Sequence, residues 1–428
     1  MKYIIATLGC KVNQYETQAM EALLRAHGHT EAAPGEAADA VIVNTCAVTA
    51  ESGRKSRQTI RRLREEHPGA VIAVGGCYSQ LEPDTAAELG AKVVFGTGDR
   101  AKFVEAVEKA AAENEASVFI DKPFERRVFE ELSAGALGGR TRAMLKVQDG
   151  CQNFCSYCII PYTRGRLRSL PLASAAAESA RLAAEGYREL VLTGIEIASY
   201  GVDLPGKPGL TELIETVAAS AGDMRIRLGS LEPTVVTEEF CGRTAATGKL
   251  CRHFHLSLQS GCDRTLRAMR RKYDAEAFFA VAERLRAAFP GCALTADLIT
   301  GFPGETEADQ AETLRFLRRV AFADMHIFPY SRRPGTPADK MPGQLSAAVK
   351  SRRAAEALSV AEETRAAYLA QNVGEELEVL FESASGEGSV GHSDNYLLVR
   401  VPEPGLHGQV KTVKITGVSG GELVGFTV

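Results

Sequence analysis

The stretch TRAMLKVQDGCQNFCSYC, residues 141 to 158, decides how the middle of this 428-residue chain is organised. Its first half, Thr141 to Gln148, mixes apolar and polar residues over the length of a β-strand. Its second half places Cys151, Cys155 and Cys158 in one C-x-x-x-C-x-x-C loop. In barrels of alternating strands and helices the chemistry lies in loops that follow strands, so this loop is a candidate site.

Further strands follow this one, and each is separated from the next by a helical segment such as Ala173 to Glu185 or Ala275 to Ala288. The predicted strands are Glu189 to Thr193, Arg225 to Gly229, His253 to Leu258, Leu294 to Ile299 and Met325 to Phe328. Six strand-helix units predict an incomplete (β/α)6 barrel, which we place at residues 137–368.

Three thiolates held this closely can each bind a different iron of a [4Fe-4S] cluster and leave the fourth iron without a protein ligand. Such an open iron can bind another molecule. Zinc is the alternative, but a structural zinc site needs four ligands, and no fourth Cys or His follows Cys158 nearby.

Residues 1–112 predict a second α/β unit, a doubly wound parallel sheet with strands at Tyr3 to Leu8, Ala40 to Val43, Ala70 to Val74 and Val93 to Phe95. Cys10, Cys46 and Cys77 follow the first three strands. Ligands of open α/β sheets bind beyond the carboxyl ends of strands, where these cysteines could converge. The alternative is three unrelated buried cysteines.

The remaining segments are a linker at residues 113–136 and a small all-β barrel at residues 369–428, which has glycine-rich turns. The barrel strands are predicted at Glu376 to Phe381, Asn395 to Val401, Gln409 to Val418 and Glu422 to Val428.

Composition indicates an ordinary globular protein, with 45% hydrophobic and 24% charged residues and a net charge of -4. We expect a cytoplasmic chain with no membrane contact, because we find neither a signal peptide nor an apolar stretch long enough to span a bilayer. Its ten cysteines are then metal ligands or free thiols rather than disulfides. Cys241, Cys251, Cys262 and Cys292 share no spacing and are expected in the core.

The loop Cys151 to Cys158, with an aromatic residue before its third cysteine and a strand before its first, resembles the radical S-adenosylmethionine superfamily. That resemblance implies that S-adenosyl-L-methionine binds the open iron and is cleaved to a radical, while the protein orients and shields it. It also places Tyr157 near the adenine of the cofactor.

The resemblance covers nearly the whole chain and is closest to the methylthiotransferases. The three predicted domains stand in the same order as in that family, whose last domain is a small β domain called TRAM. The resemblance rests on Gly301-Phe302-Pro303-Gly304-Glu305-Thr306 and on the three N-terminal cysteines. The segments TLGCKVNQ (7–14), NTCAVT (44–49), KSRQ (55–58), HLSLQSGC (255–262) and FPYS (328–331) are most similar to the branch that acts on N6-threonylcarbamoyladenosine in tRNA, often called MtaB.

The family implies two [4Fe-4S] clusters, one on each set of three cysteines, and conversion of threonylcarbamoyladenosine beside the anticodon to its 2-methylthio derivative. It also implies an electron donor such as flavodoxin or ferredoxin and a sulfur source. We expect a monomer, and we assign no catalytic residue beyond the cluster ligands. The alternatives are a sister enzyme that acts on isopentenyladenosine or on a ribosomal-protein aspartate, and a non-catalytic iron-sulfur protein that binds RNA or carries electrons.

Residues that follow strands of the central barrel point into its mouth and are candidates to hold the cofactor, although turn formation would explain each of them as well. Together with Tyr157, they are Gly194, Ser230, Glu232, Gln259 and Gly301.

Basic residues gather in three places and predict contacts with the phosphates of an anticodon stem-loop. A solvated helix face is the alternative for the first group. The candidates are Arg54, Lys55, Arg57 and Arg61, then Arg164, Arg166 and Arg168, then Arg271 and Lys272. The C-terminal segment from Gln371 has three Lys or Arg against eight Asp or Glu, so it should repel phosphates at long range.

Overall fold

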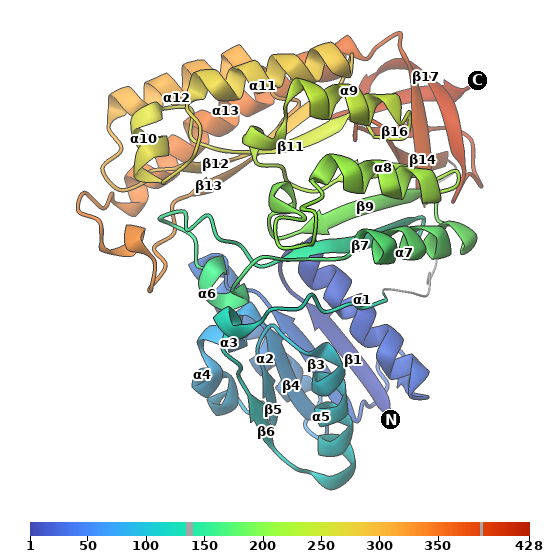
Figure 1. Cartoon of the computed structure of the whole chain (residues 1–428), viewed down its shortest axis with the longest axis vertical. Coiled ribbons are helices and arrows are strands. Elements are labelled where there is room, and N and C mark those ends of the chain that lie inside the picture. The colour runs from blue at the N-terminus through green and yellow to red at the C-terminus, as the bar shows by residue number, and fades with distance from the viewer. Residues whose placement is uncertain (134–139, 386–387) are drawn as a thin grey trace. The chain divides into compact units, whose positions relative to one another are not determined.

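A computed structural model of the chain describes residues 1–133, 140–385 and 388–428 (Figure 1). The chain forms two compact units. The first consists of Met1–Ala136, Lys146–Leu170 and Ser331–Asp339, and the second of Leu137–Leu145, Pro171–Tyr330 and Lys340–Val428. These two units differ from the four segments that the sequence predicts, and the four-segment division stays a prediction. The predicted boundary between linker and central barrel, at residues 136 and 137, lies outside the described residues.

The first unit contains a six-stranded parallel sheet in the order β2-β1-β3-β4-β5-β6, which confirms the predicted doubly wound class. The strands are β1 (Lys2–Thr7), β2 (Thr30–Glu31), β3 (Ala40–Thr45), β4 (Val71–Gly76), β5 (Val93–Phe95) and β6 (Ser117–Phe119). Strand β6 lies inside the segment predicted as a linker and pairs with β5. With three residues it is too short to show a periodicity.

Helices cover both faces of this sheet, as parallel strands require. Side chains such as Met20 and Phe103 pack on one face, and Ile60 and Leu89 pack on the other. The helices are α1 (Lys11–Ala26), α2 (Ala50–Glu66), α3 (Cys77–Leu81), α4 (Pro83–Glu88) and α5 (Arg100–Glu113). Three short elements complete the unit: the 3-10 turn η1 (Pro123–Glu125), α6 (Ile160–Arg164) and β8 (Arg168–Ser169).

The central barrel strands form where the alternating pattern predicts them. They are β7 (Arg142–Asp149), β9 (Glu189–Gly194), β10 (Arg225–Leu228), β11 (His253–Gln259), β12 (Ala293–Thr300) and β13 (Asp324–Pro329). One sheet has the order β10-β9-β7-β8 and the other β11-β12-β13, with a parallel bridge from Leu231 to Leu256. The carboxyl ends of β9 to β12 therefore carry the candidate cofactor residues Gly194, Ser230, Glu232, Gln259 and Gly301.

Helices alternate with these strands and with the 3-10 turns that follow β9 and β10. They are α7 (Leu172–Ala184), η2 (Ile197–Ser199), α8 (Leu210–Ser220), η3 (Pro233–Val235), α9 (Glu238–Ala246), α10 (Asp263–Ala268), α11 (Ala275–Ala288) and α12 (Glu307–Val320). The turn η4 (Pro337–Lys340) and the long helix α13 (Ala347–Gln371) lead into the C-terminal segment. No helix among the described residues is both long and apolar enough to cross a membrane.

The C-terminal segment is a closed five-stranded barrel in the order β14-β15-β16-β18-β17, within the second unit. Its strands are β14 (Glu376–Ser385), β15 (Gly388–Ser393), β16 (Leu398–Val401), β17 (Val410–Ser419) and β18 (Glu422–Thr427). Strand β15 is the addition to the prediction, because its sequence GSVGHS has the composition of a turn. Gly391 is required there, since a Cβ would lie 2.1 Å from the Leu380 carbonyl oxygen.

Candidate functional site: two groups of three cysteines

Cys151, Cys155 and Cys158 lie in one tight loop between β7 and α6. The Cys151 N–H donates to the carbonyl of Gly165 (3.1 Å) and the Cys158 N–H to the carbonyl of Cys155 (3.0 Å), so backbone bonds hold both ends of the loop. Gly150, at φ +73°, starts the turn, and a Cβ there would lie 1.9 Å from the Arg166 carbonyl oxygen. The sequence therefore needs glycine directly before the first cysteine.

Cys10, Cys46 and Cys77 lie at the carboxyl ends of β1, β3 and β4, as the sequence predicted. Asn13 joins two of these ends, since its Nδ2 donates to the carbonyls of Leu8 (2.8 Å) and Thr45 (3.0 Å). The Cys10 sulfur is 3.9 Å from Asn13 Oδ1. A Cβ on Gly9 would lie 3.1 Å from the Cys46 sulfur, which shows how closely the first two loops approach.

Electrostatics links the third cysteine to the other two. Burial raises the pKa of the Cys77 thiol to about 11, the charge of Arg164 opposes that rise, and the thiols of Cys46 and Cys10 add to it. Burial of the sulfur raises the pKa of the Cys10 thiol too, although the residue as a whole is exposed, and the charge of Arg164 again opposes the rise. Three thiols close enough to influence each other, with a cation beside them, suit a metal cluster that binds thiolates.

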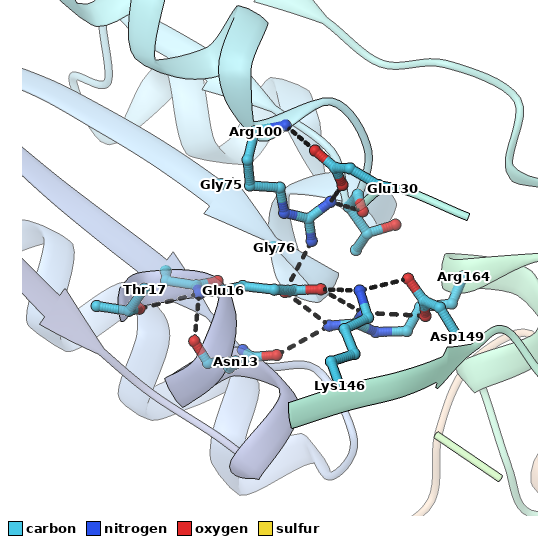
Figure 2. A network of polar contacts seen from close by, with 12 residues as sticks. Asn13, Glu16, Thr17, Gly75, Gly76, Arg100, Glu130, Lys146, Asp149 and Arg164 are labelled. Atoms are coloured by element: carbon cyan, nitrogen blue, oxygen red, sulfur yellow. Dashed lines mark hydrogen bonds and ion pairs between the residues drawn. The ribbon is translucent and has the colours of Figure 1, made fainter. Parts of the chain in front are cut away.

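Figure 2 shows a buried network of charges, which reaches the Cys10 loop through the hydrogen bond from Arg164 to Asn13. Glu16, fully buried on α1, accepts bonds from Lys146 Nζ and Arg164 Nη1, both at 2.8 Å, and pairs with Arg100 Nη2 at 2.7 Å. Burial alone would raise the pKa of Glu16, but these three cations outweigh it and hold the pKa well below its usual range. Lys146 also donates to Asp149 Oδ2 at 2.8 Å. The network therefore ties α1 to the strand and helix on either side of the Cys151 loop.

Three of the arginines predicted to contact RNA have buried side chains. Arg164 is fully buried, and Arg168 is buried against Asp149 and donates to the carbonyls of Arg164 and Arg166. The Arg271 side chain is 5% exposed and pairs with Glu232. Guanidiniums committed to internal carboxylates do not face solvent phosphates. Counting basic residues along the sequence could not separate these buried cations from exposed ones.

The other predicted RNA residues are at least partly accessible. Lys55, Arg61, Arg166 and Lys272 are exposed, and Arg54 is exposed but pairs with Glu51 on the same helix. Arg57 is half-buried, with its guanidinium 5.8 Å from the centre of the Tyr78 ring. Exposure alone does not identify an RNA contact, so these assignments stay predictions.

The predicted cofactor residues of the second unit lie at the carboxyl ends of their strands. Gly194 ends β9, Ser230 and Glu232 follow β10, Gln259 ends β11, and Gly301 follows β12. Gln259 and Gly301 have positive φ angles of 67° and 71°, and the Gly301 N–H donates to Glu305 Oε1 at 2.9 Å. Tyr157, the remaining candidate, is half-buried in the cysteine loop of the first unit.

Glu196, two residues after β9, is a further candidate site residue, which the sequence analysis did not single out. Burial raises its pKa to about 7, and the neighbouring Glu232 carboxylate adds to that rise. A carboxyl group that titrates near neutrality at the mouth of a barrel is a candidate for binding a cationic group. The signal in the sequence was its place directly after a strand and Gly194.

The other four cysteines, Cys241, Cys251, Cys262 and Cys292, are all buried, as expected for core thiols. Among the described residues, no group of three or more His, Cys, Asp or Glu side chains is arranged to hold a metal ion. The six motif cysteines therefore stay predicted ligands.

Comparisons with known proteins place the chain in a family. The model of the Radical SAM superfamily matches residues 145–317, which include the Cys151 loop, and the model called Uncharacterized protein family UPF0004 matches residues 2–97. A radical S-adenosylmethionine methyltransferase, TsrM, from Kitasatospora setae has a similar fold, with a TM-score of 0.59 at 16% identity over 79% of this chain and 77% of that one. Fold and cysteine loop together define a radical S-adenosylmethionine enzyme.

Relatives of known function narrow the class. The threonylcarbamoyladenosine tRNA methylthiotransferase MtaB of Bacillus subtilis is 39% identical over 92% of this chain and 88% of its own length. That of Thermotoga maritima is 36% identical over 97% and 94%. A tRNA-2-methylthio-N(6)-dimethylallyladenosine synthase of Frankia alni is 36% identical over 90% and 78%. This chain belongs to the radical S-adenosylmethionine tRNA methylthiotransferases.

The cofactors of this enzyme class are S-adenosyl-L-methionine and [4Fe-4S] clusters. The free thiols of the six motif cysteines are the donor type that such clusters take. When bound, the cofactors supply the radical chemistry, while the protein binds, orients and shields them.

Proposed function

We propose that this chain converts N6-threonylcarbamoyladenosine beside the anticodon of tRNA to its 2-methylthio derivative. Two separate groups of three cysteines, both in the first compact unit, support this proposal above all. Attaching a methylthio group to an unactivated aromatic carbon requires a radical generator and a sulfur carrier, and each group can hold one cluster with an open iron. The two MtaB relatives, which match over 92% and 97% of this chain, suggest the threonylcarbamoyl substrate.

We further propose Cys10, Cys46 and Cys77 as ligands of the sulfur-carrying cluster and Cys151, Cys155 and Cys158 as ligands of the radical-generating cluster. The residues at the mouth of the second unit, Gly194, Ser230, Glu232, Gln259 and Gly301, would hold S-adenosylmethionine. We place the reaction in the cytoplasm, with a small reducing protein such as flavodoxin or ferredoxin and a separate sulfur source.

The RNA-binding surface that we propose includes an aromatic group beside the Cys151 loop. Phe124 and Tyr162, each 39% exposed, pack on Phe154, with ring centres 6.4 Å and 5.9 Å from it. Exposed Arg127 and Arg166 donate to the Phe124 carbonyl at 2.6 Å and 3.2 Å. Aromatic rings next to cations suit the unstacked bases of an RNA loop.

The direct test uses anaerobically reconstituted protein and two anticodon stem-loop RNAs that differ only in the modified base. One carries threonylcarbamoyladenosine and the other carries N6-dimethylallyladenosine. We expect 5′-deoxyadenosine release and 2-methylthio product, seen by mass spectrometry of nucleosides, with the first RNA. Product only with the second RNA would assign the chain to the dimethylallyl branch, and absence of S-adenosylmethionine cleavage in fully loaded protein would contradict the enzyme itself.

A further inference from the structure

Arg164 joins the segment that follows the radical loop to the N-terminal cysteines. It lies at the end of α6, and its Nη2 donates to Asn13 Oδ1 at 3.0 Å. Asn13 is the residue that bridges the loop ends before Cys10 and Cys46. The Arg164 Nε–H is buried and has no hydrogen-bond partner among the described residues. One donor of this guanidinium is therefore left over after the internal carboxylates are satisfied.

A second arginine, Arg333, also has a buried Nε without a partner among the described residues. It belongs to the segment Ser331–Asp339, which lies in the first unit. Ser331 Oγ accepts the Ala50 N–H at 3.1 Å, so this segment is fixed to the helix that starts after Cys46. Burial lowers the pKa of Arg333, and the Glu82 carboxylate, followed by the thiols of Cys46 and Cys77, opposes that fall.

The buried charges around Glu16 do not balance. In the described structure the connected network contains the cations of Arg100, Lys146, Arg164 and Arg168 and the carboxylates of Glu16, Asp149 and Glu130. One positive charge is left over before Arg333 is counted. An uncompensated buried charge is costly, so a further anion is expected next to this network. The three thiolates of a loaded cluster would supply it.

We propose that Arg164 and Arg333 are positioning residues of the auxiliary site, where their guanidiniums balance the thiolates of Cys10, Cys46 and Cys77 and raise the reduction potential of the cluster. This inference rests on the proposed assignment of those cysteines as ligands. Reduction adds negative charge to a cluster, and a nearby fixed cation stabilises the reduced form more than the oxidised form. Removing either guanidinium charge should therefore lower the reduction potential.

The test measures the potential of the auxiliary cluster alone. A full-length background variant, Cys151→Ala/Cys155→Ala/Cys158→Ala, removes the other cluster. Arg164→Gln and Arg333→Gln are then introduced separately, and reduction is followed by electron paramagnetic resonance in a redox titration with iron content measured on each sample. We expect both variants to shift to lower potential, and Arg164→Lys to restore most of the shift because it keeps the charge.

Arg100→Gln is the matched control, since it also removes a cation from Glu16 but is not among the main charges that act on the Cys10 or Cys77 thiols. Glu16→Gln removes an anion and should shift the potential upward. Unchanged potentials in Arg164→Gln and Arg333→Gln at full iron content would overturn the proposal. If Arg164→Gln does not hold iron, Arg333→Gln and Glu16→Gln still decide it. A background variant without any iron would instead contradict the ligand assignment, and the proposal with it.

Discussion

Arg227 and Glu189 form a buried, bidentate salt bridge: Arg227 Nε donates to Glu189 Oε1 at 2.7 Å and Nη2 donates to Oε2 at 2.9 Å. Arg225 Nε donates to the same carboxylate at 2.7 Å. The two arginines also donate to carbonyls of the C-terminal barrel, at His392 and Asp394. One carboxylate at the start of β9 therefore organises the arginines that attach this barrel.

We expect Glu189→Ala to destabilise the second unit by about 3–5 kcal/mol, because it leaves buried arginines without their carboxylate. Chemical denaturation followed by circular dichroism measures this change. Glu276→Gln is the control, since Glu276 forms an exposed pair with Arg319 that solvent screens, so its loss should change the free energy of unfolding far less. Equal effects of the two substitutions would show that the Glu189 pair is not structural.

The same residue predicts a dependence on pH. Burial alone would raise the pKa of Glu189, but Arg227, Arg225 and Arg142 outweigh it and lower the pKa. The stability that Glu189 contributes is thus present above the unfolded pKa of about 4.3 and is lost as the pH falls toward the folded pKa. Glu189→Gln should flatten the fall in denaturation midpoint below about pH 4.3. A fall as steep as in the unmodified protein would contradict this prediction.

The pKa of Glu196 is shifted in the opposite direction to that of Glu189, so its pH dependence is reversed. Its folded pKa of about 7 is raised by burial and by Glu232, so its contribution to stability is most favourable below the unfolded pKa and declines as the pH rises toward 7. Ionisation near neutrality should also strengthen binding of the cationic S-adenosylmethionine between about pH 6 and 8. We expect Glu196→Gln to abolish that increase in equilibrium binding, with the exposed Glu185→Gln as control. Parallel pH profiles for Glu196→Gln and the unmodified protein would rule out this role.

Gly150→Ala should disrupt the radical loop, because its Cβ would meet the Arg166 carbonyl at 1.9 Å and alanine disfavours φ +73°. Iron should fall from about eight to about four atoms per chain, with loss of 5′-deoxyadenosine formation. Gly186→Ala is a matched control, since Gly186 also has a positive φ of 90° but nothing lies within 4 Å of its Cβ position. Retention of full iron by Gly150→Ala would contradict the expected strain.

Phe124→Ala and Tyr162→Ala should each weaken binding of the anticodon stem-loop about tenfold, since a stacked base contributes roughly 1–3 kcal/mol. Fluorescence anisotropy at constant salt measures the affinity, and Phe124→Trp should retain it. Val128→Ala, an exposed apolar residue close by in the sequence, is the control. Unchanged affinity in both alanine variants would exclude the aromatic group from the RNA surface.

Periodicity predicted the larger elements well. All six barrel strands and the four main N-terminal strands form within a few residues of their predicted bounds. It failed where an element is too short to show a period, as in β6, or has the composition of a turn, as in β15. Each failure concerns a strand that pairing with a neighbour stabilises, which no local pattern reports.

Candidate site residues were predictable where position after a strand defines them, as for Cys10, Cys46 and Cys77. Charge in the sequence was a poorer guide. Arg164 and Arg166 are two residues apart in one basic run, yet Arg164 is buried against Glu16 and Arg166 is exposed. Which arginine turns inward depends on a carboxylate more than a hundred residues earlier in the chain, so long-range packing decided the outcome.

Because the first unit is assembled from three separate stretches of the chain, it cannot be completed early in synthesis. While a nascent chain leaves the ribosome, Glu16 emerges long before Lys146 and Arg164, and Ser331–Asp339 follows much later. Glu16 therefore lacks two of its three cationic partners until residue 164 has been translated, and until then it is best accommodated in its protonated form or in contact with water. Ser331–Asp339, which carries Arg333, joins this unit later still, so the loops around the N-terminal cysteines are completed late in synthesis.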